Sequence, residues 1–181
     1  MFIETLSGKK FYFNNPQPDQ IWIVDIASGM AKICRYAGQI PRYYSVAEHV
    51  VLGLNYLQSG DLNTRRAWFL HDASEAYLAD VPGPVKEMLP EYQRIESLVM
   101  SVIFNKYGVN YDEAIHKTIR FLDRMMLRNE AEVMGKHIQD WEWAKDYPKI
   151  EGFSPNYWGY EEAERQFIIA FEELFNYGST R

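Results

Sequence analysis

The sequence has a single cysteine, few histidines and no long apolar run. With Cys34 alone, no disulfide can form within the chain, which suits a reducing compartment. A segment that crosses a membrane needs about 18 or more apolar residues in a row, and the opening residues lack the basic and apolar regions of a signal peptide. We therefore expect a cytoplasmic protein without a membrane partner.

Basic residues are also in short supply. The chain carries 19 Lys and Arg against 25 Asp and Glu, which gives a formal net charge of −6. Proteins that bind nucleic acid broadly need a basic surface to displace the counterions of the phosphate backbone. We therefore expect no nucleic-acid partner, whereas a small phosphorylated ligand could still bind where a few cations gather.

What the chain does have is apolar and aromatic bulk. Of its 181 residues, 47% are hydrophobic and 15% are aromatic, which is enough to build a core without disulfides. The sequence holds no internal repeat, no low-complexity tract and no linker rich in Pro, Gly or Ser. We expect a single domain over 1–181.

The spacing of apolar residues predicts an all-α protein, with about six helices behind a short β-hairpin-like N-terminus around Ser7 and Gly8. The helices are expected at 26–36, 46–59, 62–79, 91–106, 113–137 and 161–175. An aromatic, irregular segment at 140–160 should pack over the bundle.

Helix starts are marked by polar residues that suit an N-cap. Asp25 is expected to cap the helix at 26–36, and a capping box at 45–48 should start the next one. A similar start is expected at Asp112. Cys34 and Val133 are expected on the inner faces of their helices.

The expected helix at 62–79 is apolar around most of its girth, except for His71, Asp72 and Glu75. Burying an imidazole and two carboxylates is costly unless each group is paired or binds a metal. A metal held by His71 and Asp72, with Glu75 one turn later as a proton-transfer or supporting group, would offset that cost. A buried His–Asp hydrogen bond without an ion is the alternative, and the dipeptide alone favours it.

His49 and Asp123 shift that balance, because each lies at or beside the inner face of another expected helix. With His71 and Asp72 they provide two imidazoles and two carboxylates on three helices. Such a set suits a divalent ion such as Mn, Co, Fe, Ni or Zn and leaves coordination positions for water and substrate. Asp112 is the alternative to Asp123, but capping explains its place at a helix start, so Asp123 is preferred.

At this point the sequence resembles the HD-domain phosphohydrolases, and most closely the small bacterial and phage branch that hydrolyses deoxynucleotides. The resemblance covers roughly the first two-thirds of the chain. The blocks that carry it are DIA at 25–27, ICRYAG at 33–38, YSVAEH at 44–49, LHDASEAY at 70–77 and DVPGPVK at 80–86.

The resemblance implies an HD-domain helical bundle in which His49, His71, Asp72 and Asp123 bind a divalent metal ion: Co, Mn, Zn, Mg, Ni or Fe. Glu75 would be the acidic residue that assists proton transfer. The ion would acidify a water and polarise a phosphoryl oxygen, so that hydroxide attacks phosphorus at neutral pH. Homo-oligomers are common in the family, so we expect a dimer or hexamer, located in the cytoplasm of a bacterium or of a phage's host.

The expected reaction is hydrolysis of the 5′ phosphate ester of purine 2′-deoxynucleotides. The favoured form cleaves dATP to deoxyadenosine and triphosphate, similar to phage enzymes that spare the 2-aminoadenine nucleotide. A 5′-deoxynucleotidase that releases phosphate from monophosphates is the alternative reaction. A non-catalytic HD module that binds a nucleotide or a partner protein is the alternative of another class, and the presence of Glu75 beside all four ligands counts against it.

A phosphorylated substrate needs cations and a place for its base. The candidate cations near the expected site are Arg35, Lys86 and Arg120. Trp22, with Pro82 across from it, could form a flat apolar slot for the base. The plainer interpretation of the cations is solvated surface charge, and that of Trp22 is ordinary core.

Overall fold

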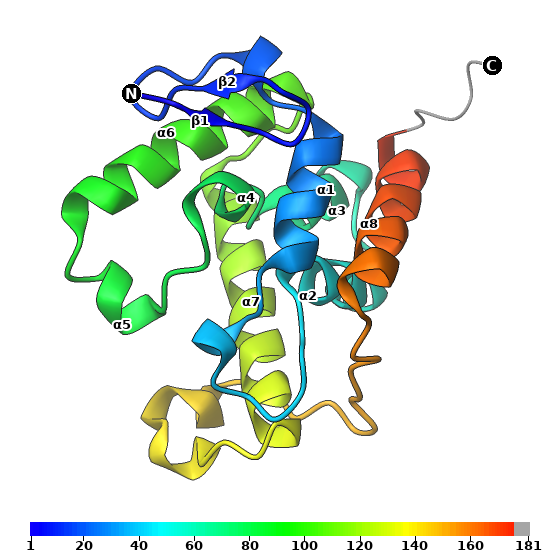
Figure 1. Cartoon of the computed structure of the whole chain (residues 1–181). Coiled ribbons are helices and arrows are strands. Elements are labelled where there is room, and N and C mark those ends of the chain that lie inside the picture. The colour runs from blue at the N-terminus through cyan, green and yellow to red at the C-terminus, as the bar shows by residue number, and fades with distance from the viewer. Residues whose placement is uncertain (176–181) are drawn as a thin grey trace.

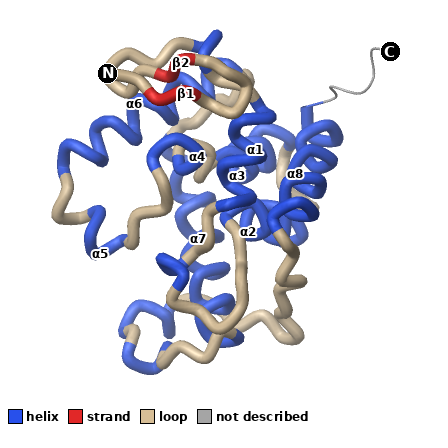
Figure 2. Tube along the Cα trace, in the orientation of Figure 1, coloured by secondary structure: helices blue, strands red, loops and turns tan. Residues whose placement is uncertain are grey.

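The computed structural model describes residues 1–175, which form a mostly helical chain (Figures 1 and 2). Two short strands, β1 (Ile3–Glu4) and β2 (Lys10–Phe11), pair in an antiparallel hairpin. The predicted all-α class and the N-terminal hairpin are therefore confirmed.

The helices of the described chain are more numerous than the sequence predicts, and several end earlier. They are α1 (Ile23–Lys32), α2 (Val46–Gly53), α3 (Leu62–Leu70), α4 (Glu75–Leu78), α5 (Gly83–Lys86), α6 (Pro90–Lys106), α7 (Glu113–Val133) and α8 (Tyr160–Phe175). Short 3₁₀ turns form parts of the connections, including two in the aromatic segment after α7.

The core lies where α1, α2, α3 and α8 pack together, and α7 runs alongside them (Figure 1). Trp68 and Phe69 of α3 are fully buried, and so is Phe167 of α8. The rings of Phe69 and Phe167 lie 4.3 Å apart between centroids. The apolar face predicted for the last helix is thus confirmed, because Phe167, Phe171 and Leu174 are all buried.

Two glycines let helices of this core approach closely. A Cβ atom at Gly53 would lie 2.1 Å from the ring of Trp68, and one at Gly29 would lie 2.7 Å from the Cβ of Ala76. Both distances are shorter than atoms tolerate, so α2 can pack on α3, and α1 on α4, only because these positions lack a side chain.

The expected single helix at 62–79 is broken. α3 ends at Leu70 and α4 begins at Glu75, and the residues between them form a tight turn with i→i+3 hydrogen bonds, such as Ala73 N to Leu70 O at 2.9 Å. Periodicity did not predict the break, because His71 keeps near-helical backbone angles (φ −61°, ψ −29°). The turn sets the direction of the His71 and Asp72 side chains.

The first helix also differs from the prediction. α1 begins at Ile23 with Trp22 as its N-cap, and Asp25 lies inside the first turn. Asp25 accepts hydrogen bonds from the backbone N–H and the hydroxyl of Ser7, each at 2.7 Å. Its carboxylate therefore joins the hairpin to α1 instead of capping the helix.

The chain leaves α1 earlier than expected. α1 ends at Lys32, and Cys34 lies beyond it in an isolated antiparallel bridge with Ser45. The prediction of a helical Cys34 was wrong because this pairing is non-local. The bridge brings the segment after α1 next to the start of α2.

The capping box at 45–48 is only half formed. Ser45 accepts a hydrogen bond from the backbone N–H of Glu48, as predicted. The Glu48 carboxylate accepts instead from three successive backbone N–H groups of Asn156, Tyr157 and Trp158, at 2.7 to 2.9 Å. It thereby holds the segment before α8 against α2.

The long helix α7 starts as predicted and ends early. Asp112 caps it by accepting from the N–H of Ile115. The helix stops at Val133 before a left-handed Gly135 (φ +74°), and Val133 is 43% exposed, so its predicted inner position was wrong. Phe153 is buried, which fits the expected packing of the irregular segment over the bundle.

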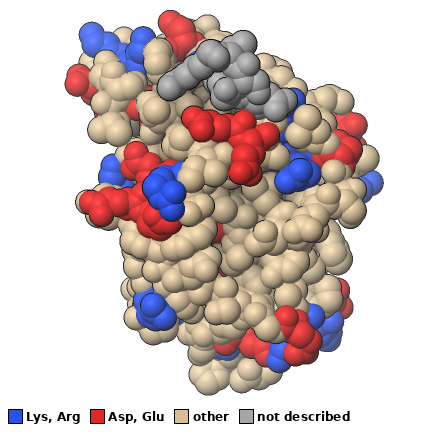
Figure 3. All heavy atoms as spheres, turned by 90° about the vertical axis from the view of Figure 1, so that its right-hand side faces the viewer, with Lys and Arg blue, Asp and Glu red and all other residues tan. Residues whose placement is uncertain are grey.

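The surface carries mixed charge on the face that includes α8. Figure 3 shows acidic and basic side chains scattered among uncharged ones there, without a continuous basic patch over the described atoms. Across residues 1–175, none of the helices has the length and apolar character needed to cross a membrane.

Candidate metal centre

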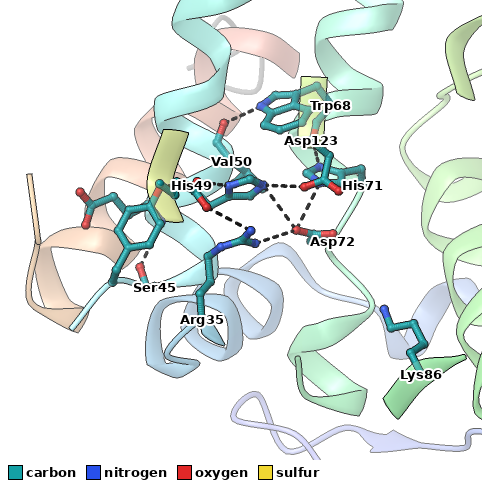
Figure 4. A network of polar contacts seen from close by, with 12 residues as sticks. Arg35, Ser45, His49, Val50, Trp68, His71, Asp72, Lys86 and Asp123 are labelled. Carbon is teal, nitrogen blue, oxygen red and sulfur yellow. Dashed lines mark hydrogen bonds and ion pairs between the residues drawn. The ribbon is translucent and has the colours of Figure 1, made fainter. Parts of the chain in front are cut away.

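Four side chains that are distant in the sequence meet at one point: His49 on α2, His71 and Asp72 after α3, and Asp123 on α7 (Figure 4). Nε2 of His49 lies 3.8 Å from Oδ2 of Asp72 and 3.5 Å from Oδ1 of Asp123. Nε2 of His71 lies 3.2 Å and 4.0 Å from the same two oxygens. The structure thus brings together the four residues that the sequence singles out.

The ring orientation of both histidines is set through Nδ1. Nδ1 of His49 lies 2.5 Å from Oε1 of Glu130, and Nδ1 of His71 lies 2.6 Å from the carbonyl oxygen of Trp68. Because both partners are acceptors, each Nδ1 carries the hydrogen and donates it. Each Nε2 is then directed at the two carboxylates.

The two Nε2 atoms have unmet hydrogen-bonding capacity. Both are buried and have no hydrogen-bond partner among the described residues. His49, His71 and Asp72 offer ligand atoms that lie within 4.8 Å of one another. Two buried, unpaired imidazole nitrogens beside carboxylates fit a divalent metal ion, with the Nδ1 acceptors fixing the rings as in known metal sites.

The carboxylates of this cluster are ionised at neutral pH. Burial alone would raise the pKa of Asp72, but His71, His49 and Arg35 hold it well below its usual range. The pKa of Asp123 is also lowered, because the nearby imidazoles of His49, at 3.5 Å, and of His71 outweigh its desolvation. Both side chains are therefore available as charged ligands.

The pKa of His49 is raised from 6.5 to about 9. Burial and the neighbouring Arg35 act to lower it, but the charge of Glu130, the hydrogen bond to Glu130 and the nearby carboxylate of Asp123 outweigh them. Without a metal, Nε2 therefore carries a proton at neutral pH, and an ion bound at this point would take the place of that proton.

Arg35 lies beside the candidate metal centre, where its guanidinium group is held between two carboxylates. It is 8% exposed, and its guanidinium nitrogens lie 3.5 Å from Oδ2 of Asp72 and 3.2 Å from Oε2 of Glu130. The turn after it is strained, because Tyr36 (φ +58°) and Ala37 (φ +51°) adopt the left-handed region without being glycine. Backbone strain of this kind is typical of functional positions.

Glu130 was missed by the sequence prediction. It is fully buried on α7, and the pKa of its carboxyl is lowered to about 2 because Arg35 and His49 outweigh its burial. Glu130 follows Asp123 by seven residues, which is two helical turns, so both lie on one face of α7. That spacing was the one signal in the sequence that pointed to it.

Glu75 begins α4 directly after the turn that holds Asp72, and its backbone N–H donates to the Asp72 carbonyl at 2.9 Å. It is 5% exposed, and its Oε2 has no hydrogen-bond partner in residues 1–175. Burial, together with the charges of Asp72 and Asp80, raises the pKa of Glu75 well above its usual range. This shift favours the protonated form of Glu75, which is the form that a proton donor needs.

Comparison with known proteins shows the family of the chain. No family model matches it. It is 39% identical over 137 residues to the uncharacterized protein YfdR of Escherichia coli K12, an alignment that covers 74% of this chain and 72% of YfdR. The chain belongs to the YfdR family.

A second relative of this YfdR-family chain is the uncharacterized protein RCAP_rcc00048 of Rhodobacter capsulatus. The two are 31% identical over 136 residues, which cover 70% of this chain and 69% of the relative. Neither name assigns an activity, so family membership by itself says nothing about the chemistry of the cluster.

A cleft of about 610 Å³ opens beside His71 and Asp72 in this YfdR-family chain. Its lining also includes Phe104, Tyr111 and His116. The rings of Phe104 and Tyr111 stack at 4.5 Å, and His116 meets Tyr111 edge-on at 5.9 Å. The cleft is therefore lined both by charged side chains, such as Asp72 and Lys86, and by aromatic ones.

The predicted substrate residues are not all at this cleft. Lys86 lines it, with Nζ 2.7 Å from Oε1 of Glu96. Trp22, Pro82 and Arg120 are exposed and are not among its described lining residues. The predicted base slot is thus not part of this cleft, and Trp22 lies at the N-cap of α1, whereas Arg35 follows the other end of that helix.

Proposed function

We propose that this protein is a metal-dependent phosphohydrolase with an HD-type site that acts on the 5′ phosphate ester of purine 2′-deoxynucleotides. The observation that carries the proposal is the pair of buried, unpaired Nε2 atoms of His49 and His71 facing Asp72 and Asp123 beside an open cleft. The resemblance of the surrounding sequence blocks to HD-domain phosphohydrolases supports it.

The four side chains fit a divalent ion of the borderline class, such as Mn, Co, Fe, Ni or Zn. When bound, such an ion supplies an acidified water and a positive charge at a phosphoryl oxygen. The side chains of Asp72 and Asp123 are the more exposed ligands, at 18% and 37%, whereas His49 is fully buried. Substrate therefore approaches from the aspartate side.

Glu75 is the proton donor in this proposal. Breaking the bond between phosphorus and the 5′ oxygen leaves an alkoxide that needs a proton, and a buried carboxyl group with a raised pKa is suited to deliver it. The raised pKa of Glu75 and its place one turn after His71 suit that role. A supporting role beside the ion is the other option, and the raised pKa of Glu75 favours proton donation.

The cleft suits the nucleoside part of the substrate. His116 and Asp123 are seven residues apart on α7, which is about 10 Å along the helix. A nucleoside whose phosphate lies at the metal cluster would extend toward Tyr111 and His116 over this span. A base can stack on an aromatic ring such as that of Tyr111. The amides of Asn105 and Asn110, which also line the cleft, can accept or donate hydrogen bonds to it.

The cations of the cleft favour a short phosphate chain. Among its described lining residues Lys86 is the only lysine, and there is no arginine. Lys86 is paired with Glu96, and Arg35 is held by Asp72 and Glu130. The small number of cations therefore favours the 5′-deoxynucleotidase reaction in this cleft. The resemblance to phage enzymes favours the other reaction, hydrolysis of dATP to deoxyadenosine and triphosphate.

Product analysis separates these reactions. Purified protein with Mn or Co is incubated with separate pools of deoxynucleoside mono-, di- and triphosphates and of ribonucleotides. We expect orthophosphate and nucleoside from the monophosphates. Triphosphate and deoxyadenosine from dATP would select the triphosphohydrolase instead, and metal-bound protein that turns over none of the pools would select a non-catalytic binding module.

A further inference from the structure

One buried carboxylate connects several parts of the candidate metal centre. Oε1 of Glu130 accepts from Nδ1 of His49 at 2.5 Å and from the hydroxyl of Tyr44 at 2.8 Å. Oε2 of Glu130 lies 3.2 Å from a guanidinium nitrogen of Arg35. The partners come from the segment after α1, the segment before α2, and α2 itself.

We propose that Glu130 is a positioning residue that orients two of the four metal ligands, His49 directly and Asp72 through Arg35. The inference rests on the metal site of the proposed function, but not on its reaction. It concerns the affinity of the site for the ion alone.

The direct effect is on His49. An acceptor at Nδ1 keeps a hydrogen on that nitrogen, so that Nε2 is the nitrogen that exchanges its proton for a metal ion. The same contact fixes the rotation of the ring, so that Nε2 faces Asp72 and Asp123 at 3.8 Å and 3.5 Å. Without it, either nitrogen could carry the hydrogen.

The indirect effect passes through Arg35. One guanidinium nitrogen lies 3.5 Å from Oδ2 of Asp72 while another faces Glu130. A planar guanidinium that is held on one edge presents its other edge in a fixed direction. Glu130 thereby helps to hold Asp72, a ligand from a different part of the chain.

His71 does not depend on Glu130. Its Nδ1 donates to the backbone carbonyl of Trp68, three residues earlier, at 2.6 Å. A backbone acceptor sets this ring whatever side chain stands at position 130. Loss of Glu130 should therefore weaken the site without abolishing it.

The test compares Glu130→Gln, which keeps the size of the side chain, with Glu132→Gln as a matched control. Glu132 lies on the same helix but pairs with Arg128 and Lys149 away from the ligands. Affinity for Mn and Zn is measured by calorimetry on protein whose fold is checked by circular dichroism. We expect Glu130→Gln to bind about 10- to 100-fold more weakly and Glu132→Gln to bind as the wild type does.

A second readout separates positioning from simple support of the core. Tyr44→Phe removes one hydrogen bond from Glu130 but leaves its contact with His49. In proton NMR of the Zn-loaded protein, the Nδ1 proton of His49 should keep its position in Tyr44→Phe and shift in Glu130→Gln, because a neutral amide oxygen is a weaker acceptor than a carboxylate. Equal metal affinity in Glu130→Gln and wild type, with an unchanged His49 signal, would overturn the proposal.

Arg35→Lys provides a variant if Glu130→Gln does not fold. Lysine keeps a positive charge near Glu130 but cannot bridge two carboxylates with one planar group. Metal affinity should fall while the His49 Nδ1 proton stays in place, and unchanged affinity would overturn the link to Asp72. If wild-type protein binds no metal, the metal site and this proposal are both overturned. If wild-type protein binds metal but hydrolyses no nucleotide, only the proposed reaction is overturned.

Discussion

Nε2 of His49 and Oδ1 of Asp123 lie 3.5 Å apart, although α2 and α7 are distant in the sequence. Asp112, the other aspartate that the sequence offered, caps the start of α7 through the N–H of Ile115. The geometry thus separates two residues that sequence spacing alone left as alternatives.

Asp123→Ala and Asp112→Ala should therefore behave differently. Asp123→Ala removes a proposed ligand and should lose metal binding and activity while the protein stays folded. Asp112→Ala removes an N-cap and should lower the free energy of unfolding by about 0.5–2 kcal/mol, with metal binding unchanged. Metal content and urea denaturation of both variants check this, and metal loss in Asp112→Ala alone would reverse the assignment.

Glu75→Gln should keep the metal and lose most of the turnover. The amide is similar in size but has no acidic proton to donate, and general acid catalysis contributes about 10²- to 10⁴-fold. The kcat is measured with metal content determined on the same sample. The control is Glu87→Gln, because Glu87 is an exposed carboxylate just after α5. Full activity in Glu75→Gln would falsify the role assigned to Glu75.

Tyr111→Ala should weaken recognition of the base. Stacking of a base on an aromatic ring contributes about 1–3 kcal/mol, which corresponds to roughly 5- to 150-fold in KM for a deoxynucleotide. Deoxyribose 5-phosphate, which has no base, is the control substrate, and its hydrolysis should not change. An equal loss with both substrates would show that Tyr111 supports the site and does not contact the base.

The metal-free protein should become less stable as the pH rises. The folded-state pKa of His49 is about 9 against an ordinary value of 6.5. The raised pKa contributes stability that is fully present below pH 6.5 and is lost as the pH rises through about 9. The Tm of the wild-type protein, measured with chelator, should therefore fall between pH 7 and pH 9. In His49→Gln this fall should be smaller, because the titrating imidazole is gone.

Metal should change this pH dependence. An ion that replaces the His49 proton binds more tightly as the proton becomes easier to remove, so metal affinity should rise toward pH 9. The stabilisation of the protein by added Mn should grow over the same range. Affinity that falls with rising pH would contradict proton displacement from His49.

The sequence predicted that His49, His71, Asp72 and Asp123 come together because titratable groups interrupt apolar helix faces. The helices of His49 and Asp123 begin at the expected residues, although both end earlier than expected. The break between Leu70 and Glu75 was not predictable from periodicity, because a turn with i→i+3 bonds preserves near-helical spacing. The apolar pattern fixes which residues are buried but not how sharply the chain turns between them.

Glu130 and Trp22 show the other limit of prediction from sequence. The role of Glu130 depends on its contacts with Arg35, Tyr44 and His49. The two hydrogen-bonded partners, Tyr44 and His49, lie more than 80 residues away from it in the sequence. Trp22 was assigned to a base slot although no local pattern indicates which end of α1 faces the cleft. Both positions depend on tertiary packing, which single-sequence patterns do not report.

The most direct test is the release of deoxyadenosine from dAMP and from dATP by one protein sample, followed by chromatography before and after the metal is removed. We expect release from at least one of the two by protein with Mn, no release after treatment with a chelator, and recovery when Mn is added back. Release that continues unchanged without metal, or no release from either nucleotide by metal-loaded protein, would contradict a metal-dependent phosphohydrolase at His49, His71, Asp72 and Asp123.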